Sequence, residues 1–100
     1  YNDAKHFITE TLLAWGLWSD RRVDLMLMIA AHESGGFKHN KQIGGGPARG
    51  PFQMERRTHD QVWLHSDTIH KRAKKYGITR KDADEMIDDH AYALWMAVHY

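Results

Sequence analysis

Apolar residues recur with the period of an α-helix along most of this chain, and one glycine-rich stretch interrupts the pattern. Near the start, Ile8, Leu12 and Trp15 fall on one helical face. Residues 37–52 contain four of the eight glycines and both prolines, which is typical of a loop. No segment alternates apolar and polar residues over a convincing length. We therefore expect a mainly α fold with at most a small β element in the glycine-rich loop.

The size of the chain allows one hydrophobic core. A chain of 100 residues buries roughly two-thirds of its unfolded surface, and without cysteine it has no disulfide to stabilise it. The composition, 42% hydrophobic and 27% charged, excludes the disordered and collagen-like classes. We expect residues 1–100 to form a single domain. Because the chain begins without Met and stops inside a predicted helix, we expect a longer polypeptide that continues past Tyr100.

The charges nearly cancel, with 14 basic against 13 acidic residues. A net charge of +1 gives no strong field to attract nucleic acid or a membrane surface. The longest apolar stretch, residues 23–31, is interrupted by Asp24 and is too short to span a bilayer. We therefore expect neither a nucleic-acid partner nor membrane insertion.

Capping signals divide the chain into five expected helices. The first covers residues 3–15, and the second runs from Ser19 or Asp20 to Ser34. The second is apolar almost all round, which predicts a buried central helix. The other three start from a capping box at Thr58, from a cap at Ser66 or Asp67 with an end at Gly77, and from a cap at Thr79 with an end near Val98.

Glu33 is the strongest candidate for chemistry. It lies at the C-terminal end of the apolar second helix, where the glycine-rich loop begins. Burial disfavours a charged carboxylate, and the negative end of a helix acts in the same direction, so both raise its pKa. A carboxyl group that is protonated near neutral pH can serve as a general acid.

Two further segments strengthen this interpretation. Glu33-Ser34 is followed, after the loop, by Gly50-Pro51-Phe52-Gln53-Met54 and, five residues after Gln53, by Thr58. This pattern resembles the lytic transglycosylase domain of the soluble (SLT) type, in the goose-type lysozyme-like superfamily. The resemblance implies a lysozyme-like helical domain with Glu33 as catalytic acid/base. It also implies that Ser34, Phe52, Gln53 and Met54 shape the substrate cleft.

The resemblance implies degradation of cell-wall peptidoglycan, a glycosidase-like lyase reaction without cofactor or metal. The β-1,4 bond between N-acetylmuramic acid and N-acetylglucosamine would be cut, leaving a 1,6-anhydro sugar. Members of this family occur in the bacterial cell envelope or periplasm and in bacteriophage virions. The Gly44-Gly45-Gly46-Pro47 loop favours a phage-borne member within a larger polypeptide or virion assembly.

Glu55 keeps a second reaction open. It lies two residues after Gln53, where goose-type lysozymes resemble this chain by having an acidic residue. In that case Glu55 helps to position water, and the same bond is hydrolysed. An inverting hydrolase needs its two carboxyl groups roughly 6.5–9.5 Å apart. The other interpretation of Glu55 is a surface residue paired with Arg56, Arg57 or a lysine.

Other classes of function have weaker signals. His32-Glu33 begins like a zinc-protease helix, but position 36 is Gly instead of the second His. Residues 71–79 are basic and have the spacing of a helix-turn-helix, although the acidic residues that follow would repel phosphate. A wall-binding module without catalytic activity is the third alternative.

Overall fold

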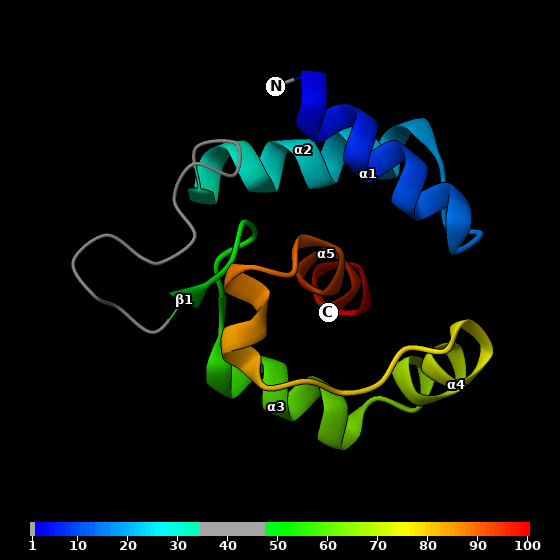
Figure 1. The fold of residues 1–100 in the computed structure, drawn as a ribbon, viewed down its shortest axis with the longest axis vertical. Helices are drawn as coiled ribbons and strands as arrows, with labels where there is room; N and C mark the ends of the chain where they lie inside the picture. Colours follow the sequence, from blue (N-terminus) through cyan, green and yellow to red (C-terminus); the bar gives the residue numbers. More distant parts are fainter. Residues whose placement is uncertain (1, 35–47) are drawn as a thin grey trace.

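The computed structural model describes residues 2–34 and 48–100, and the side chains of residues 3–31 and 50–100. The described chain is mainly helical, as the sequence predicts (Figure 1). Its elements, in chain order, are α1 (Asn2–Ala14), α2 (Asp20–Ser34), β1 (Ala48–Arg49), β2 (Met54–Glu55), α3 (Arg56–His65), α4 (Asp67–Tyr76), the 3-10 helix η1 (Ala83–Ile87) and α5 (His90–His99).

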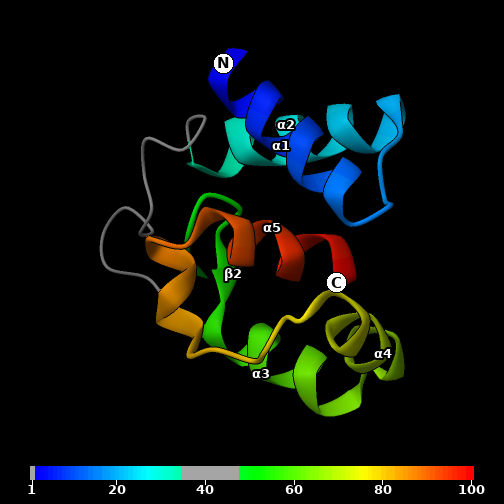
Figure 2. The same ribbon diagram turned by 45° about the vertical axis from the view of Figure 1, so that its right-hand side comes forward.

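Helix α5 lies at the centre of the molecule. In both ribbon views it runs between the α1–α2 pair and the α3–α4 pair (Figures 1 and 2). Residues 92–96 are all buried, so this helix is covered on every side. Trp95 is completely buried, and its ring meets that of Trp15 edge-on, with 5.1 Å between the ring centroids. This contact joins α5 to the residue that directly follows α1.

The prediction that α2 is the buried central helix is wrong. Among the α2 side chains that the structure describes, Val23, Met26, Leu27 and Ala30 are buried, and they lie on one face. Leu25 and Met28, on the other face, are 48% and 66% exposed. A small domain has room for one helix that is surrounded on all sides, and α5 takes that place.

Three of the predicted helix ends are confirmed. The Ser19 hydroxyl accepts a hydrogen bond of 3.1 Å from the backbone N–H of Arg22, at the start of α2. Ser66 caps α4 in the same way, accepting from the N–H of Ile69 at 3.3 Å. Gly77 ends α4 in the left-handed conformation, at φ +69°.

The predicted start of α3 is wrong. The helix begins at Arg56, so Thr58 is its third residue and not its cap. Glu55 occupies the capping position but makes no side-chain cap hydrogen bond. The backbone of Glu55 is extended because it belongs to strand β2, and the helix follows the strand directly.

The single helix predicted after Thr79 is divided in two. Asp82 caps η1 by accepting from the N–H of Asp84 at 2.9 Å, and Asp89 caps α5 by accepting from the N–H of Tyr92 at 2.9 Å. Short carboxylates that bind nearby backbone N–H groups compete with a continuous helix. The helix-turn-helix alternative therefore lacks its second helix, because η1 has only five residues.

The expected small β element is a hairpin. Strand β1 pairs antiparallel with β2, with Ala48 opposite Glu55 and Arg49 opposite Met54. The turn begins at Gly50, at φ +76°, and the N–H of Gln53 donates to the Gly50 carbonyl at 3.0 Å. A Cβ on Gly50 would lie 2.3 Å from the carbonyl oxygen of Met86, so glycine lets the turn pack closely against η1.

We expect Gly50→Ala to lower the free energy of unfolding by about 2–4 kcal/mol, because it adds a left-handed alanine and a clash with backbone. Gly77→Ala is the matched control, since Gly77 has a similar φ of +69° but no atom within 4 Å of its Cβ position. It should cost only about 1 kcal/mol. Urea unfolding followed by circular dichroism measures both. Equal losses would contradict the close packing of the turn.

Candidate active site

A pocket of about 380 Å³ lies where the hairpin turn meets α2 and the end of α5. All four residues predicted from the turn region to contact substrate, Phe52, Gln53, Met54 and Glu55, line it. Ile29 of α2 contributes to the wall, and the lining also includes Thr58, Ala97 and Tyr100. The pocket therefore combines an apolar wall with a few polar groups, as is common in ligand sites.

Gln53 is held in place by the turn that it ends. Its φ of +52° is left-handed, which is rare for a residue other than glycine and costs about 1 kcal/mol. Its side-chain Nε2 donates to the Gly50 carbonyl at 2.7 Å, and its backbone N–H donates to the same oxygen. These two bonds keep the side chain folded over the turn, at the edge of the pocket.

Phe52 and Met54 serve the core as well as the pocket. They are only 6% and 8% exposed and belong to the main hydrophobic cluster. Only a small part of each side chain therefore reaches the pocket surface. The sequence predicts cleft residues at these positions, and the structure places them in the wall between cleft and core.

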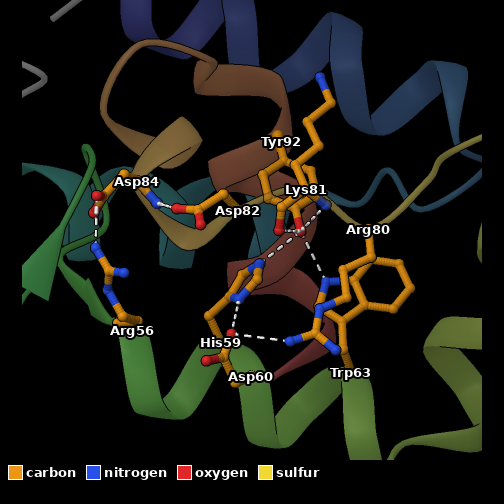
Figure 3. Close-up of polar contacts among 9 residues, drawn as sticks. All are labelled: Arg56, His59, Asp60, Trp63, Arg80, Lys81, Asp82, Asp84 and Tyr92. Atoms are coloured by element: carbon orange, nitrogen blue, oxygen red, sulfur yellow. Dashed lines mark hydrogen bonds and ion pairs between the residues drawn. The ribbon is translucent and has the colours of Figure 1, made fainter.

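Glu55 is an exposed residue that lines the pocket. Among the residues that the structure describes, it has no ion-pair partner. Its neighbour Arg56 pairs instead with Asp84 of η1, at 2.5 Å (Figure 3). Within the described part of the chain, the alternative of a Glu55 ion pair with a neighbouring cation is therefore not realised.

Glu33 and Ser34 are the last two residues of α2, and their side chains lie outside the described residues. The same holds for the residues 44–47 that suggested a phage-borne member. The backbone nevertheless relates Glu33 to the pocket. Ile29 lines the pocket and precedes Glu33 by four residues, which is about one helical turn.

A buried polar network between α3 and α5 is a feature that sequence reasoning missed (Figure 3). The hydroxyl of Tyr92 lies 2.6 Å from Nε2 of His59, and His59 has no exposed surface. Trp63 Nε1 and the backbone N–H of Lys81 both donate to this hydroxyl, at 2.8 and 3.0 Å. The network joins α3, α5 and the segment before η1. The i, i+4 spacing of His59 and Trp63 could have indicated a shared helix face but not a shared partner.

The hydrogen bonds indicate which groups of this network donate. The two N–H donors occupy both lone pairs of the Tyr92 oxygen, so its single hydrogen has two acceptors in reach, His59 Nε2 at 2.6 Å and the Lys81 carbonyl at 3.3 Å. We assign it to the shorter contact with His59, an arrangement in which His59 Nδ1 donates to the Asp60 carboxylate at 2.8 Å. Burial raises the pKa of Tyr92, which keeps it a hydroxyl donor. The bond from His59, together with Arg80, lowers the pKa of Asp60.

We expect Tyr92→Phe to lower the free energy of unfolding by about 2–4 kcal/mol, because His59, Trp63 and the Lys81 N–H lose a shared buried partner. Tyr76→Phe is the control, since the Tyr76 hydroxyl has no hydrogen-bond partner in the described structure. It should change stability by less than about 0.5 kcal/mol. Urea unfolding gives both values, and a neutral Tyr92→Phe would show that the network contributes nothing.

His99, near the end of α5, is partly buried, and its surroundings lower its pKa. Its Nδ1–H donates to the Trp95 carbonyl at 2.7 Å, and its ring centroid lies 4.1 Å from that of Trp95. Burial lowers the pKa of His99, and the nearby Arg72 and Arg22 lower it further, although the Trp95 carbonyl opposes them. The neutral imidazole is therefore the form that the fold favours.

This predicts a loss of stability in acid. Below about pH 6.5 the unfolded chain binds a proton at His99 more readily than the folded chain does, so unfolding becomes easier as the pH falls. At higher pH the imidazole is neutral in both states. Urea unfolding at pH 7.5 and pH 5.5 should show a smaller acid-induced loss in His99→Gln than in the wild type. His6→Gln, which removes an exposed imidazole on α1, is the control. An unchanged loss in His99→Gln would refute the assignment.

Searches of protein-family models, curated proteins and solved structures find no match for this chain. Among the side chains that the structure describes, those of residues 3–31 and 50–100, no three of His, Asp or Glu are grouped so that they could hold a metal ion. No helix in the described ranges is long and apolar enough to cross a membrane. The proposals that follow therefore rest on the residues of the pocket and on their spacing.

Proposed function

We propose that this protein is a lysozyme-like lytic transglycosylase that cuts the glycan strand of peptidoglycan, with Glu33 as acid/base. One observation carries the proposal. The residues that resemble the family's second motif, together with Thr58, line a single pocket with α2, the helix that ends in Glu33-Ser34. If the resemblance is correct, these two distant segments must lie together at the site. Neither motif alone implies that they do.

The chemistry uses one carboxyl group twice. Glu33 donates its proton to the bridging oxygen of the β-1,4 bond between N-acetylmuramic acid and N-acetylglucosamine, and the bond to the anomeric carbon breaks. The substrate's own N-acetyl oxygen stabilises the positive charge at that carbon. The Glu33 carboxylate then removes the proton of the sugar's 6-hydroxyl, whose oxygen bonds to the anomeric carbon. The product is a 1,6-anhydro sugar, and no water is consumed.

The described pocket suits these steps. Ile29, Phe52 and Met54 form an apolar wall, and a wall of this kind raises the pKa of a carboxyl group placed against it. Gln53, fixed by its two bonds to Gly50, and the hydroxyl of Thr58 offer hydrogen-bonding groups for a sugar. Ser34, which follows Glu33 directly, is the remaining residue assigned to the site.

Glu55 favours a second candidate, hydrolysis of the same bond. It is an exposed residue that lines the pocket and has no ion-pair partner among the described residues, so its carboxylate is available to position a water molecule. In this case the protein is a goose-type-like muramidase with Glu33 as acid. In either case the proposed setting is the bacterial cell envelope, reached from the periplasm or from a phage virion.

Digestion of purified peptidoglycan, followed by mass spectrometry of the soluble fragments, tests the function. A transglycosylase releases fragments one water lighter than those of a hydrolase. We expect Glu33→Gln to lower cleavage by about 10²-fold or more, because the general acid is lost. Glu55→Gln should leave the anhydro product unchanged. Full activity in Glu33→Gln would overturn the assignment, and ordinary reducing ends that disappear with Glu55→Gln would establish the hydrolase.

A further inference from the structure

Both backbone polar groups of Lys81 contact one hydroxyl group, that of Tyr92 (Figure 3). The Lys81 N–H donates to the Tyr92 oxygen at 3.0 Å, and the Lys81 carbonyl oxygen lies 3.3 Å from the same atom. Lys81 belongs to the connection between α4 and η1, in which residues 78–82 have no regular secondary structure. The Tyr92 hydroxyl therefore attaches the backbone of this connection to α5.

The hydrogen bonds of this hydroxyl are balanced while His59 is neutral. The oxygen of a tyrosine hydroxyl has two lone pairs and one hydrogen to offer. The Lys81 N–H and Trp63 Nε1–H occupy the two lone pairs, and the hydrogen is donated to His59 Nε2. Every N–H that faces the Tyr92 oxygen then has an acceptor.

Protonation of His59 removes this balance. An imidazolium ring donates from both nitrogens, so Nε2 no longer accepts the hydrogen of Tyr92. Among the described groups in reach of the hydroxyl, the Lys81 carbonyl remains as the acceptor for that hydrogen. Three N–H donors, from His59, Trp63 and Lys81, then face two lone pairs. One of the three donors must leave the oxygen.

The Lys81 N–H is the donor that leaves. Its contact with the Tyr92 oxygen, at 3.0 Å, is the longest of the three, against 2.8 Å from Trp63 Nε1 and 2.6 Å from His59 Nε2. The side chains of His59 and Trp63 are buried, so neither can bond water instead, and a buried donor without a partner is costly. Lys81 is exposed and lines a polar pocket of about 360 Å³, where water can accept its N–H.

The charged groups around His59 come from α3, the connection and the cap of α5. Asp60, next to His59 on α3, accepts from His59 Nδ1 at 2.8 Å and from Arg80 of the connection at 3.2 Å. The side chain of Lys81 is paired with Asp89 at 2.5 Å. Asp60 therefore balances a positive charge on the imidazole from the Nδ1 side, whereas Arg80 and Lys81 oppose it. Their carboxylate partners, Asp60 and Asp89, reduce that opposition.

We propose that His59, Tyr92 and Lys81 form a pH-sensitive switch in the connection between α4 and η1. Protonation of His59 transfers the Tyr92 hydrogen to the Lys81 carbonyl and releases the Lys81 N–H to water. The switch acts at the start of η1, because Lys81 directly precedes Asp82, the cap of that helix. The hairpin turn of the candidate site packs against the Met86 carbonyl of the same helix. The inference goes beyond the proposed function, since it holds whatever reaction takes place in the pocket.

The test is amide hydrogen exchange of the wild-type chain, measured by NMR from about pH 8 to about pH 5, the range in which histidines titrate. The exchange rate of Lys81 is expressed relative to that of an unstructured peptide at each pH, and the titration of the His59 ring is followed in the same samples. We expect the protection of Lys81 to fall about fivefold, the effect of one lost hydrogen bond, with the midpoint of the His59 titration. The amide of Ile78, which donates to the Ala73 carbonyl at 2.9 Å, is the control in the same connection and should keep its protection.

His59→Gln should abolish the fall in Lys81 protection, because its amide does not titrate, and His99→Gln should leave the fall unchanged. Constant protection of Lys81, a midpoint different from that of His59, or an equal fall for Ile78 would overturn the inference. A His59 ring that keeps one protonation state over this range would overturn it as well. If His59→Gln does not fold, the comparison of the two midpoints in the wild type still decides. None of these results depends on whether the protein cuts peptidoglycan.

Discussion

Burial of the middle of α5 on every side is the constraint on which the rest of this fold depends. Five successive residues of the helix, 92–96, are buried, so other elements must cover every side of it. The α1–α2 pair covers one side and the α3–α4 pair the other (Figure 2). Such burial is favourable for apolar side chains, but a buried polar atom that lacks a partner is destabilising. The Tyr92 hydroxyl meets this requirement through His59, Trp63 and Lys81, and it thereby attaches α3 to the core.

The pocket arises from the same arrangement. Because the end of α5 projects between α2 and α3, a hollow remains on each side of it, and the hairpin turn closes the middle. The contact between Gly50 and η1 fixes the position of the turn, and the hydrogen bonds of Gln53 to Gly50 fix its shape. The site residues are therefore carried by helices and a short hairpin whose positions are set by packing. A site supported in this way can hold its polar groups in a defined geometry.

Much of the fold could be predicted from local signals. Ser19, Ser66 and Gly77 mark helix ends by chemistry that acts within one turn, and the structure has those ends where they were expected. The choice of central helix failed because apolar content alone does not say which helix is surrounded. The break between η1 and α5 could not be located from the sequence because Asp82 and Asp89 belong to a run of acidic residues, several of which could cap a helix.

The candidate site likewise contains some residues that could be predicted from local patterns and others that could not. The residues at the turn, 52–55, could be predicted to lie together because the order of Glu33-Ser34, the segment Gly50 to Met54 and Thr58 resembles a known motif, and the structure places all four on one pocket. Tyr100 and Ala97 could not, because their place in the pocket depends on how α5 packs against the other helices. His59 could not be assigned either, since its partner Tyr92 is 33 residues away in the sequence. Contacts at such separations depend on the whole topology and leave no local pattern.

The close contact between Gly50 and Met86 has a consequence for comparing sequences. A position where any side chain meets backbone carbonyl atoms at 2.3 Å admits one amino acid only. The contacting atoms belong to the backbone of Met86 in η1, so no substitution at that position removes them. In distant homologues, we therefore expect this glycine to be retained even where the surrounding residues differ. Counting three residues onward from it would locate the equivalent of Gln53 in an alignment that otherwise has few landmarks.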